Sequence, residues 1–289
     1  MRYDPLFPAL PAGPSDTVIA MVNLHCLPGP IHRRMSVREY RDFPRHLGWK
    51  YEYWNGAIHV TPCQIAVSLT LELASRPRTL RSGVGVRLRG LEDEDAAGLE
   101  ELFLSAFSET IHFVGCSPDE IAHSARQHLR HFFAEHRGRR LPASRLAEAK
   151  DKIVGAALVR EFRRGPLLDM LGVVHERQRS GIGGALLDAA VEELVHRGET
   201  MLHSTVMLGN EASLDWHLRH GFQEEPDLRV LAMRSRFFAE EVKRRRRLQD
   251  ASPAELAELE ETAAQWHELY QSFEEIVVKR PDLACPVFY

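Results

Sequence analysis

Between residues 86 and 234, strand-like apolar runs alternate with segments that have the apolar periodicity and the capping residues of helices. This pattern predicts strands at 86–89, 144–149, 153–160, 167–174, 201–207 and 229–233. It predicts helices at 96–107, 118–136, 181–196 and 211–220. Strands and helices in this order indicate an α/β fold built on a mixed sheet.

Turn and capping residues support these boundaries. Ser117-Pro118-Asp119-Glu120 combines an N-cap serine, a proline in the first turn and a capping-box glutamate, so a helix should begin there. Gly198 is placed to end the helix of residues 181–196. Lys150-Asp151-Lys152 should form the turn of a hairpin between two strands.

The first 80 residues contain a proline-rich part and a small structured part. Residues 1–34 should run as an extended arm, because proline fixes φ and has no N–H group. Tyr51–Trp54 and Ala57–Val60 flank Asn55-Gly56, a pair that favours the type I′ turn of a hairpin. We expect a short helix at Gln64–Ala74.

Residues 236–289 have a helical pattern. Ser252-Pro253-Ala254-Glu255 repeats the helix-start signal. The apolar residues that follow are spaced three and four apart: Leu256, Leu259, Ala263, Trp266, Tyr270, Phe273 and Val277. This face should pack against the preceding domain or against a second subunit, so a homodimer is the alternative. We therefore expect three parts, at 1–80, 81–235 and 236–289.

Composition excludes several classes of protein. The 289 residues are 44% hydrophobic and 27% charged, which is typical of a globular chain and not of a disordered one. A net charge of −4 argues against a general nucleic-acid binder. The run Lys243–Arg247 could contact nucleic acid or an acidic partner, but a solvated helix face is its more frequent explanation. The four cysteines form no CxxC pair, which disfavours a disulfide scaffold or a zinc ribbon.

Neither a membrane segment nor a metal site is expected. The apolar stretch Thr17–Leu27 is too short to span a bilayer, and the N-terminus lacks the order of a signal peptide, so we expect a cytoplasmic protein. Four histidines lie on the helix expected at 118–136, but only His128 and His131 share a face and no carboxylate pair completes a ligand set.

The most informative segment runs from Leu171 to Leu187. A strand leads into a turn that contains Gly181, Gly183 and Gly184, and a helix begins at once. Backbone N–H groups at a helix N-terminus lack intrahelical partners and lie at the positive end of the helix dipole. Because glycine lets a bulky anion approach these donors, the segment predicts a phosphate or diphosphate site.

Two nucleotide motifs do not fit this segment. A P-loop requires Gly-Lys-Ser/Thr, whereas Gly183 is followed by Gly184 and Ala185. The dinucleotide fingerprint GxGxxG would start at Gly181 and would need glycine where Leu186 stands.

The pattern Q/R-x-x-G-x-G/A does fit, as Gln178-Arg179-Ser180-Gly181-Ile182-Gly183. At this point the chain resembles the GNAT acetyltransferase superfamily. The segment from Asn210 to Gly221-Phe222 is similar to a second signature of that superfamily, and the order of elements from Val86 to Met233 also matches.

The resemblance implies a GNAT-like fold and acetyl-CoA, or a longer acyl-CoA, as donor, with no metal. It implies that Gln178 is also a cofactor-binding residue. It implies that the diphosphate is held by the main-chain amides of Arg179, Ser180, Gly181, Ile182, Gly183 and Gly184. The strand Leu171-Gly172-Val173 would pair with the pantetheine arm, and an amide near Val173 would point at the thioester oxygen. Asn210 would contact the cofactor, although an N-cap role also explains it.

The resemblance implies acetyl transfer to a primary amine of a small molecule or peptide. We expect direct attack in a ternary complex, since neither motif contains a cysteine that could form an acyl-enzyme. His217 stands where many members have a tyrosine acid, and imidazole can also donate a proton. The general base stays open between a water relay and His175, Glu176 or His203. A non-catalytic acyl-CoA sensor or interaction protein, with a degenerate acetyltransferase site, is the alternative function.

Two further expectations concern other parts of the chain. An acceptor groove should be formed by Phe107–Cys116 and Phe162–Pro166, with Glu109 as its clear carboxylate. Met35–Tyr40 together with Tyr51–Gly56 resembles the first part of a bacterial restriction-endonuclease-like family, over about residues 35–75. The metal-binding carboxylates and lysine of that family would need another long segment, so we interpret this similarity as a structural remnant.

Overall fold

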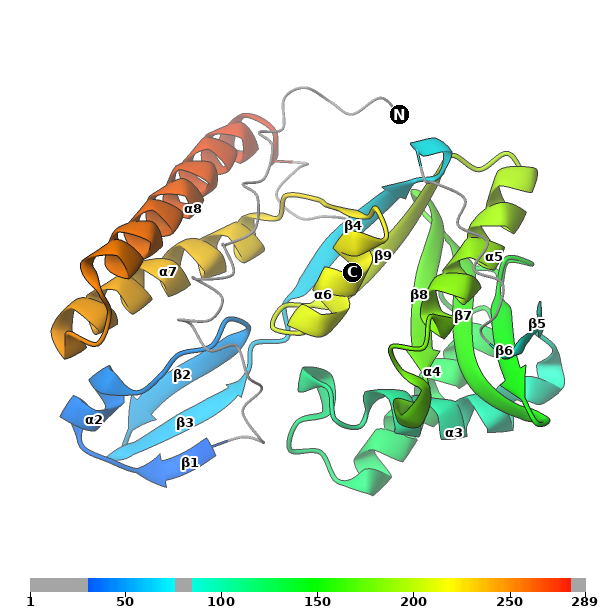
Figure 1. The fold of residues 1–289 in the computed structure, drawn as a ribbon, viewed down its shortest axis with the longest axis horizontal. Helices are drawn as coiled ribbons and strands as arrows, with labels where there is room; N and C mark the ends of the chain where they lie inside the picture. The colour runs from blue at the N-terminus through cyan, green and yellow to red at the C-terminus, as the bar shows by residue number, and fades with distance from the viewer. Residues whose placement is uncertain (1–30, 76–84, 282–289) are drawn as a thin grey trace. The chain divides into compact units, whose positions relative to one another are not determined.

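The computed structural model describes residues 31–75 and 85–281 (Figure 1). Most of the proline-rich arm predicted at 1–34 lies outside the described residues, and its last four residues form strand β1 (Ile31–Arg34). The chain divides into two compact units. One comprises residues up to 68 with 206–213 and 224 onwards, and the other comprises 69–205 with 214–223. The three-part division stays a prediction.

The first unit contains a three-stranded antiparallel sheet in the order β1–β3–β2. Helix α2 (Val37–Asp42) precedes β2 (Trp49–Trp54), and β3 (Ala57–Pro62) follows it. Asn55 and Gly56 have φ values of 53° and 73°, the left-handed pair of a type I′ turn. The predicted hairpin is therefore confirmed.

The predicted helix at Gln64–Ala74 is wrong. Strand β4 (Ala66–Glu72) occupies this segment and is followed by a short 3₁₀ turn at Leu73–Ser75. Val67, Leu69 and Leu71 are all almost wholly buried. This spacing of two, together with a β-branched residue, is the pattern of a strand and outweighs the helix-forming residues nearby.

The larger sheet is mixed and has the order β10–β4–β9–β8–β7–β6–β5. Its remaining strands are β5 (Arg87–Gly90), β6 (Arg145–Ala149), β7 (Lys152–Phe162), β8 (Gly165–Val173), β9 (Met201–Met207) and β10 (Gln223–Glu224). Strands β5 to β8 are antiparallel, whereas β8 and β9 are parallel. The predicted α/β class with a mixed sheet is confirmed.

Helices cover both faces of this sheet in the second unit (Figure 1). Helices α3 (Ala96–Phe107) and α4 (Pro118–Phe133) lie over one face, and their apolar side chains form a core with Leu146, Ala156, Leu158 and Met170. Helix α5 (Ile182–His196) packs on the other face. Gly155 of β7 faces this helix so closely that a methyl group on it would lie 3.0 Å from Ile182. Successive strand residues such as Gly155 and Ala156 point to opposite faces.

Local signals place these elements correctly. Ser117 caps α4 in a complete capping box with Glu120, as predicted. Lys150 and Asp151 have φ values of 51° and 60°, so a left-handed turn joins β6 and β7. Gly198, with φ 80°, follows the end of α5.

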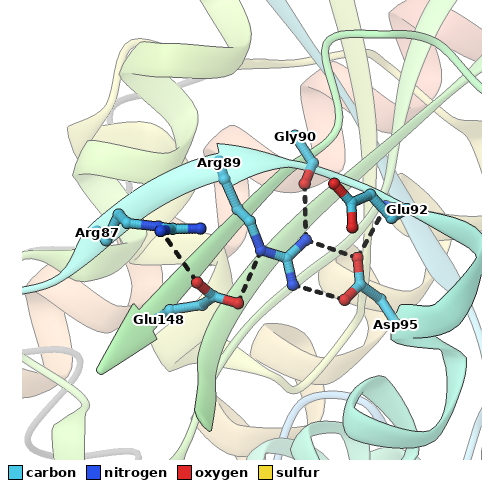
Figure 2. Close-up of polar contacts among 6 residues, drawn as sticks. All are labelled: Arg87, Arg89, Gly90, Glu92, Asp95 and Glu148. Atoms are coloured by element: carbon cyan, nitrogen blue, oxygen red, sulfur yellow. Dashed lines mark hydrogen bonds and ion pairs between the residues drawn. The ribbon is translucent and has the colours of Figure 1, made fainter. Parts of the chain in front are cut away.

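An arginine at the edge of the sheet connects β5 with β6 and with the segment before α3 (Figure 2). Arg89 donates from Nη1 and Nη2 to the two carboxylate oxygens of Asp95, at 2.7 and 2.6 Å, and from Nε to Glu148 at 2.7 Å. Asp95 also accepts the backbone N–H of Glu92 at 2.8 Å. Arg89 therefore joins two carboxylates that are far apart in the sequence.

The predicted strand at residues 229–233 is wrong, because helix α7 (Leu228–Leu248) begins there. The Asp227 side chain accepts hydrogen bonds from the backbone N–H groups of Arg229 (2.7 Å) and Val230 (3.3 Å). This N-cap satisfies two donors of the first turn. Val230, Leu231, Arg234 and Phe237 then recur on one buried face, a helical period that continues beyond the five-residue window.

Helix α8 (Pro253–Lys279) begins at the predicted serine cap and packs along α7 within the first unit. Four residues of the predicted apolar face are buried: Leu259, Trp266, Phe273 and Val277. The face is therefore covered by a neighbouring helix of the same chain. A homodimer through this helix stays a prediction.

Candidate functional site

The segment between β8 and α5 forms a tight turn in which two left-handed residues flank Ser180. Arg179 has φ 60° and Gly181 has φ 88°. The first hydrogen bond of α5 runs from Ala185 N–H to the Gly181 carbonyl at 3.0 Å. The amides of residues 182–184 precede it, so they have no acceptor within the helix.

Side chains of the turn hold its conformation. Gln178 Nε2 donates to the Val173 carbonyl at 3.3 Å, and Ser180 Oγ donates to the Arg177 carbonyl at 2.6 Å. These bonds tie the turn to the end of β8 and to the 3₁₀ turn at His175–Arg177. Gln178 and Ser180 thus shape the backbone of the turn with their side chains.

The glycines at the start of α5 lie against helix α6 (Glu211–Arg219) and the residue that follows it. A methyl group on Gly184 would lie 3.2 Å from Nε2 of His220, and one on Gly183 would lie 3.5 Å from the Trp216 ring. His220 stacks on Trp216 with ring centroids 4.0 Å apart and bonds through Nδ1 to its carbonyl at 2.7 Å. A side chain at position 184 would therefore press against His220, independently of any ligand.

These features fit a diphosphate. Amides without an acceptor in their own helix, at the positive end of a 15-residue helix and beside residues without side chains, are the donors that an anionic group requires. Trp216 and His220, which the sequence analysis did not single out, form a wall beside them. Their distance from the glycines in sequence concealed this contact.

Strand β8 has the edge that the predicted pantetheine segment requires. Residues 171–173 pair with Gly155–Ala157 of β7 on one side. On the other side, the described ladder with β9 consists of Leu167–His203 and Leu168–Ser204 only. On that side, the backbone of residues 171–173 therefore lies past the last residue of β8 that pairs with β9 in the described ladder.

Asn210 and His217 have local partners in the structure. Asn210 Oδ1 accepts a hydrogen bond from the Ser213 backbone N–H at 3.3 Å, which is an N-cap of α6. His217 is only 5% exposed, and its Nε2 lies 3.1 Å from Ser204 Oγ. A cofactor role for Asn210 and an acid role for His217 stay predictions.

The three side chains considered as bases lie in different environments. His203 is buried, with Nε2 3.2 Å from the Arg164 carbonyl. His175 is exposed, and its Nδ1 lies 3.9 Å from a carboxylate oxygen of Glu109. Glu176 is exposed on the 3₁₀ turn after β8. Glu109 is the carboxylate expected in the acceptor groove. Of the three candidate bases, His175 is the one that has a described contact with it.

The two segments expected to line one acceptor groove lie at opposite ends of β8. Phe107 contacts the far end, where a methyl group on Gly172 would lie 3.1 Å from its ring. Phe162 and Gly165 form the hairpin at the beginning of the strand. His112 lies against Phe113, with ring centroids 4.6 Å apart, and burial lowers its pKa below the ordinary value of 6.5.

A partly buried polar cluster was not predicted. His128 of α4, Arg160 of β7 and Asp169 of β8 meet on the face of the sheet that α4 covers. Arg160 Nε lies 2.6 Å from Asp169 Oδ1, and His128 Nε2 lies 3.3 Å from Asp169 Oδ2. The three residues share no sequence motif, so only the fold reveals them.

The described residues contain no metal site, no membrane-spanning helix and no unpaired basic run. In residues 31–75 and 85–281 no group of three or more His, Cys, Asp or Glu side chains could hold a metal ion. None of the helices described is long and apolar enough to cross a bilayer. Each cation of the run 243–247 has a carboxylate partner, drawn from Asp42, Glu240, Glu241, Asp250 and Glu260. This pairing weakens the case for nucleic-acid binding by the run.

Comparison with protein families identifies the segment that contains this site. Residues 99–222 match the model of the Acetyltransferase (GNAT) family. The match includes β8, the turn before α5 and His217. It does not extend to residues 35–75, so the similarity to a restriction-endonuclease-like family stays a hypothesis. No protein of curated function shows a significant match to the chain.

Several solved structures are similar over about half of the chain. A functionally unknown conserved protein from Staphylococcus epidermidis is 17% identical, with 55% of this chain and 57% of that chain covered and a TM-score of 0.41. An N-acetyltransferase from Sphaerobacter thermophilus is 21% identical, with coverage of 55% and 48% and a TM-score of 0.42. PaiA N-acetyltransferase from Thermoplasma acidophilum, solved with coenzyme A, is 18% identical, with coverage of 48% and 91% and a TM-score of 0.40. The chain thus spans about half the length of the first two.

Proposed function

We propose that this protein transfers an acetyl group from acetyl-CoA to a primary amine of a small molecule or peptide. The observation that carries the proposal is the turn between β8 and α5, where the amides of residues 182–184 precede the first helical hydrogen bond. The family match of residues 99–222 supports the same activity.

The chain's own residues would hold the donor in an extended form. The amides of Arg179 to Gly184 bind the diphosphate, and the backbone of Leu171–Val173 pairs with the pantetheine arm. Acetyl-CoA supplies an acyl group activated as a thioester. An amide near Val173 stabilises the negative charge that develops on the thioester oxygen, an effect of about 3–4 kcal/mol in enzymes that have such donors. Holding donor and acceptor together contributes much of the remaining acceleration.

His217 would return a proton to the departing thiolate, and Asn210 would contact the donor. The buried contact between His217 and Ser204 favours a second candidate function, an acyl-CoA sensor without turnover. The two functions differ in chemistry and share the binding site. One experiment on binding and one on turnover therefore separate them.

Isothermal titration with acetyl-CoA tests the site. Because a carboxylate in the turn would repel the diphosphate, R179E should weaken binding tenfold or more, which is about 1.4 kcal/mol. R163E is the matched control, since Arg163 is exposed in the hairpin at the opposite end of β8, and it should bind like wild type. Equal binding by both variants, or no binding of acetyl-CoA at millimolar concentration by wild type, refutes the assignment.

Thiol release over a panel of primary amines tests turnover. The transferase should release coenzyme A only when an acceptor amine is present, and H217A should lower kcat more than it raises the KM for acetyl-CoA. Tight binding with no thiol release on any amine would favour the sensor.

A further inference from the structure

The backbone at the end of β8 determines where the acyl group of a bound donor would lie. Val174 N–H donates to the Val154 carbonyl of β7 at 3.0 Å. Because the N–H groups of an antiparallel strand point to alternate sides, the amide of Val173 points away from β7. That side lies past the last β8 residue that pairs with β9 in the described ladder. With the thioester oxygen at this amide, the acyl carbon lies beside the backbone of Gly172 and Val173.

The two faces of the sheet border this position differently. Val173 pairs with Gly155, and a methyl group on Gly155 would lie 3.0 Å from Ile182 of α5. Since paired residues share a face, the Val173 side chain points to the face that α5 covers. Gly172 points to the opposite face but has no side chain. On that face, the acyl position is therefore bordered by whatever packs against Gly172.

The last turn of α3 brings an aromatic ring to this place. A methyl group on Gly172 would lie 3.1 Å from the Phe107 ring and 3.3 Å from Cβ of Ala106. The same turn is joined to the segment after β8, because His175 N–H donates to Ser105 Oγ at 3.1 Å. The Phe107 ring therefore faces the acyl position across a residue that has no side chain.

Neighbouring contacts hold the ring in this position. The Phe107 ring centroid lies 4.9 Å from that of Phe103, which is 8% exposed. The Phe107 carbonyl accepts from Thr110 N–H at 2.9 Å and from Thr110 Oγ1 at 2.8 Å. Phe107 is partly buried and packs against the core that α3 and α4 form on the sheet. Because side chains that pack on a dense core keep fixed rotamers, the ring limits the space beside Gly172.

We propose that Phe107 is the residue that selects the acyl group of the donor and restricts it to a short chain, with acetyl preferred; this inference rests on the proposed function. Each methylene added to the acyl group must find room beside the Phe107 ring. In a hydrophobic pocket of fixed size, one methylene changes kcat/KM by about 10–200-fold. Acetyl-, propionyl- and butyryl-CoA differ only in this chain, so they measure the available space directly.

The test compares wild type, F107A and F133A with acetyl-CoA and butyryl-CoA as donors. Phe133 is the matched control, because it packs against the same core. Its ring lies 5.1 Å from the guanidinium of Arg140, which bridges to Arg160 near the opposite end of β8. F107A should raise the ratio of kcat/KM for butyryl-CoA to that for acetyl-CoA by about tenfold or more, whereas F133A should keep the wild-type ratio. F107L keeps part of the side-chain volume, so it should admit propionyl-CoA and exclude butyryl-CoA, and it decides the question should F107A not fold.

Isothermal titration gives a readout that does not depend on turnover. Wild type should bind butyryl-CoA about tenfold more weakly than acetyl-CoA, and F107A should bind the two alike. Equal binding of both donors by wild type overturns the inference, as does an equal change of the donor ratio in F107A and F133A. A wild type that binds acetyl-CoA but transfers no acetyl group refutes the proposed transferase instead, and titration of F107A then decides the role of Phe107 alone.

Discussion

Replacing Arg89 with alanine should destabilise the second unit far more than removing a neighbouring arginine from the same strand. Arg89 donates three charge-assisted hydrogen bonds to two carboxylates, as Figure 2 shows. Its side chain is 19% exposed and that of Asp95 is 9% exposed. The substitution leaves both carboxylates partly buried without their main partner.

Breaking a buried ion pair by removing one partner costs about 3–5 kcal/mol. Asp95 keeps the hydrogen bond from Glu92 N–H, and Glu148 keeps its contact with Arg87 at 3.4 Å. Since these contacts remain, we expect R89A to lower the free energy of unfolding by about 3 kcal/mol, the lower end of that range. Urea unfolding followed by circular dichroism measures the loss, and hydrogen exchange of β6 amides assigns it to this unit.

The matched control is R87A. Arg87 contacts Glu148 from the same strand but is 74% exposed, so its loss should cost less than about 1 kcal/mol. If R87A and R89A destabilise the protein equally, burial does not determine the strength of these pairs and the reasoning fails.

The same pair predicts a pH dependence. Hydrogen bonding to Arg89 is the main cause that lowers the pKa of Asp95 below its ordinary value of 3.8. A lowered folded pKa means that the unfolded state binds more protons, so this carboxylate stabilises the fold above about pH 4 and loses that effect as the pH falls through its folded pKa. The difference in stability between wild type and R89A should therefore narrow in acid. A constant difference from pH 7 to pH 2 would contradict this origin.

The remaining predictions concern the first unit. D227A should lower the free energy of unfolding in urea by about 1–2 kcal/mol, because it removes the N-cap of α7. D227N should retain most of the stability, since asparagine also caps helices. E241A should cost about 3–5 kcal/mol, since the buried Glu241 carboxylate accepts from both Arg244 and Arg245, whereas E240A should change stability by less than about 0.5 kcal/mol at its exposed pair. Equal loss of stability in D227A and D227N would refute the capping role of Asp227. Equal loss in E241A and E240A would refute the role of burial in the Glu241 ion pairs.

Features fixed by neighbouring residues could be predicted from the sequence. Asn55-Gly56 and Lys150-Asp151 form their turns, and Ser117 and Ser252 cap their helices, because these signals act within four residues. The turn at 178–184 belongs to the same class, since its left-handed glycine and the amides that precede the first helical hydrogen bond depend only on local geometry.

Features that depend on distant contacts could not. Residues 229–233 resemble a strand in a short window, and only the Asp227 cap and the face continued through Arg234 show a helix. The helix expected at Gln64–Ala74 failed because burial of alternate residues in β4 outweighed local propensity. The His128 cluster needs a bulge at Asp169, and no local pattern indicates where a ladder gains a residue.

Glycine has several separate functions around the turn, and they explain why a short motif can be so informative. Gly181 is favoured by its left-handed backbone, and Gly184 leaves room for the His220 ring. Gly155, on a different strand, lets α5 pack closely enough to place its first turn at the end of β8. Because backbone conformation, helix packing and anion access converge on the same few positions, substituting any one of these glycines disturbs the geometry on which the amide donors depend. The motif thus describes a whole local structure as well as the proposed ligand contact.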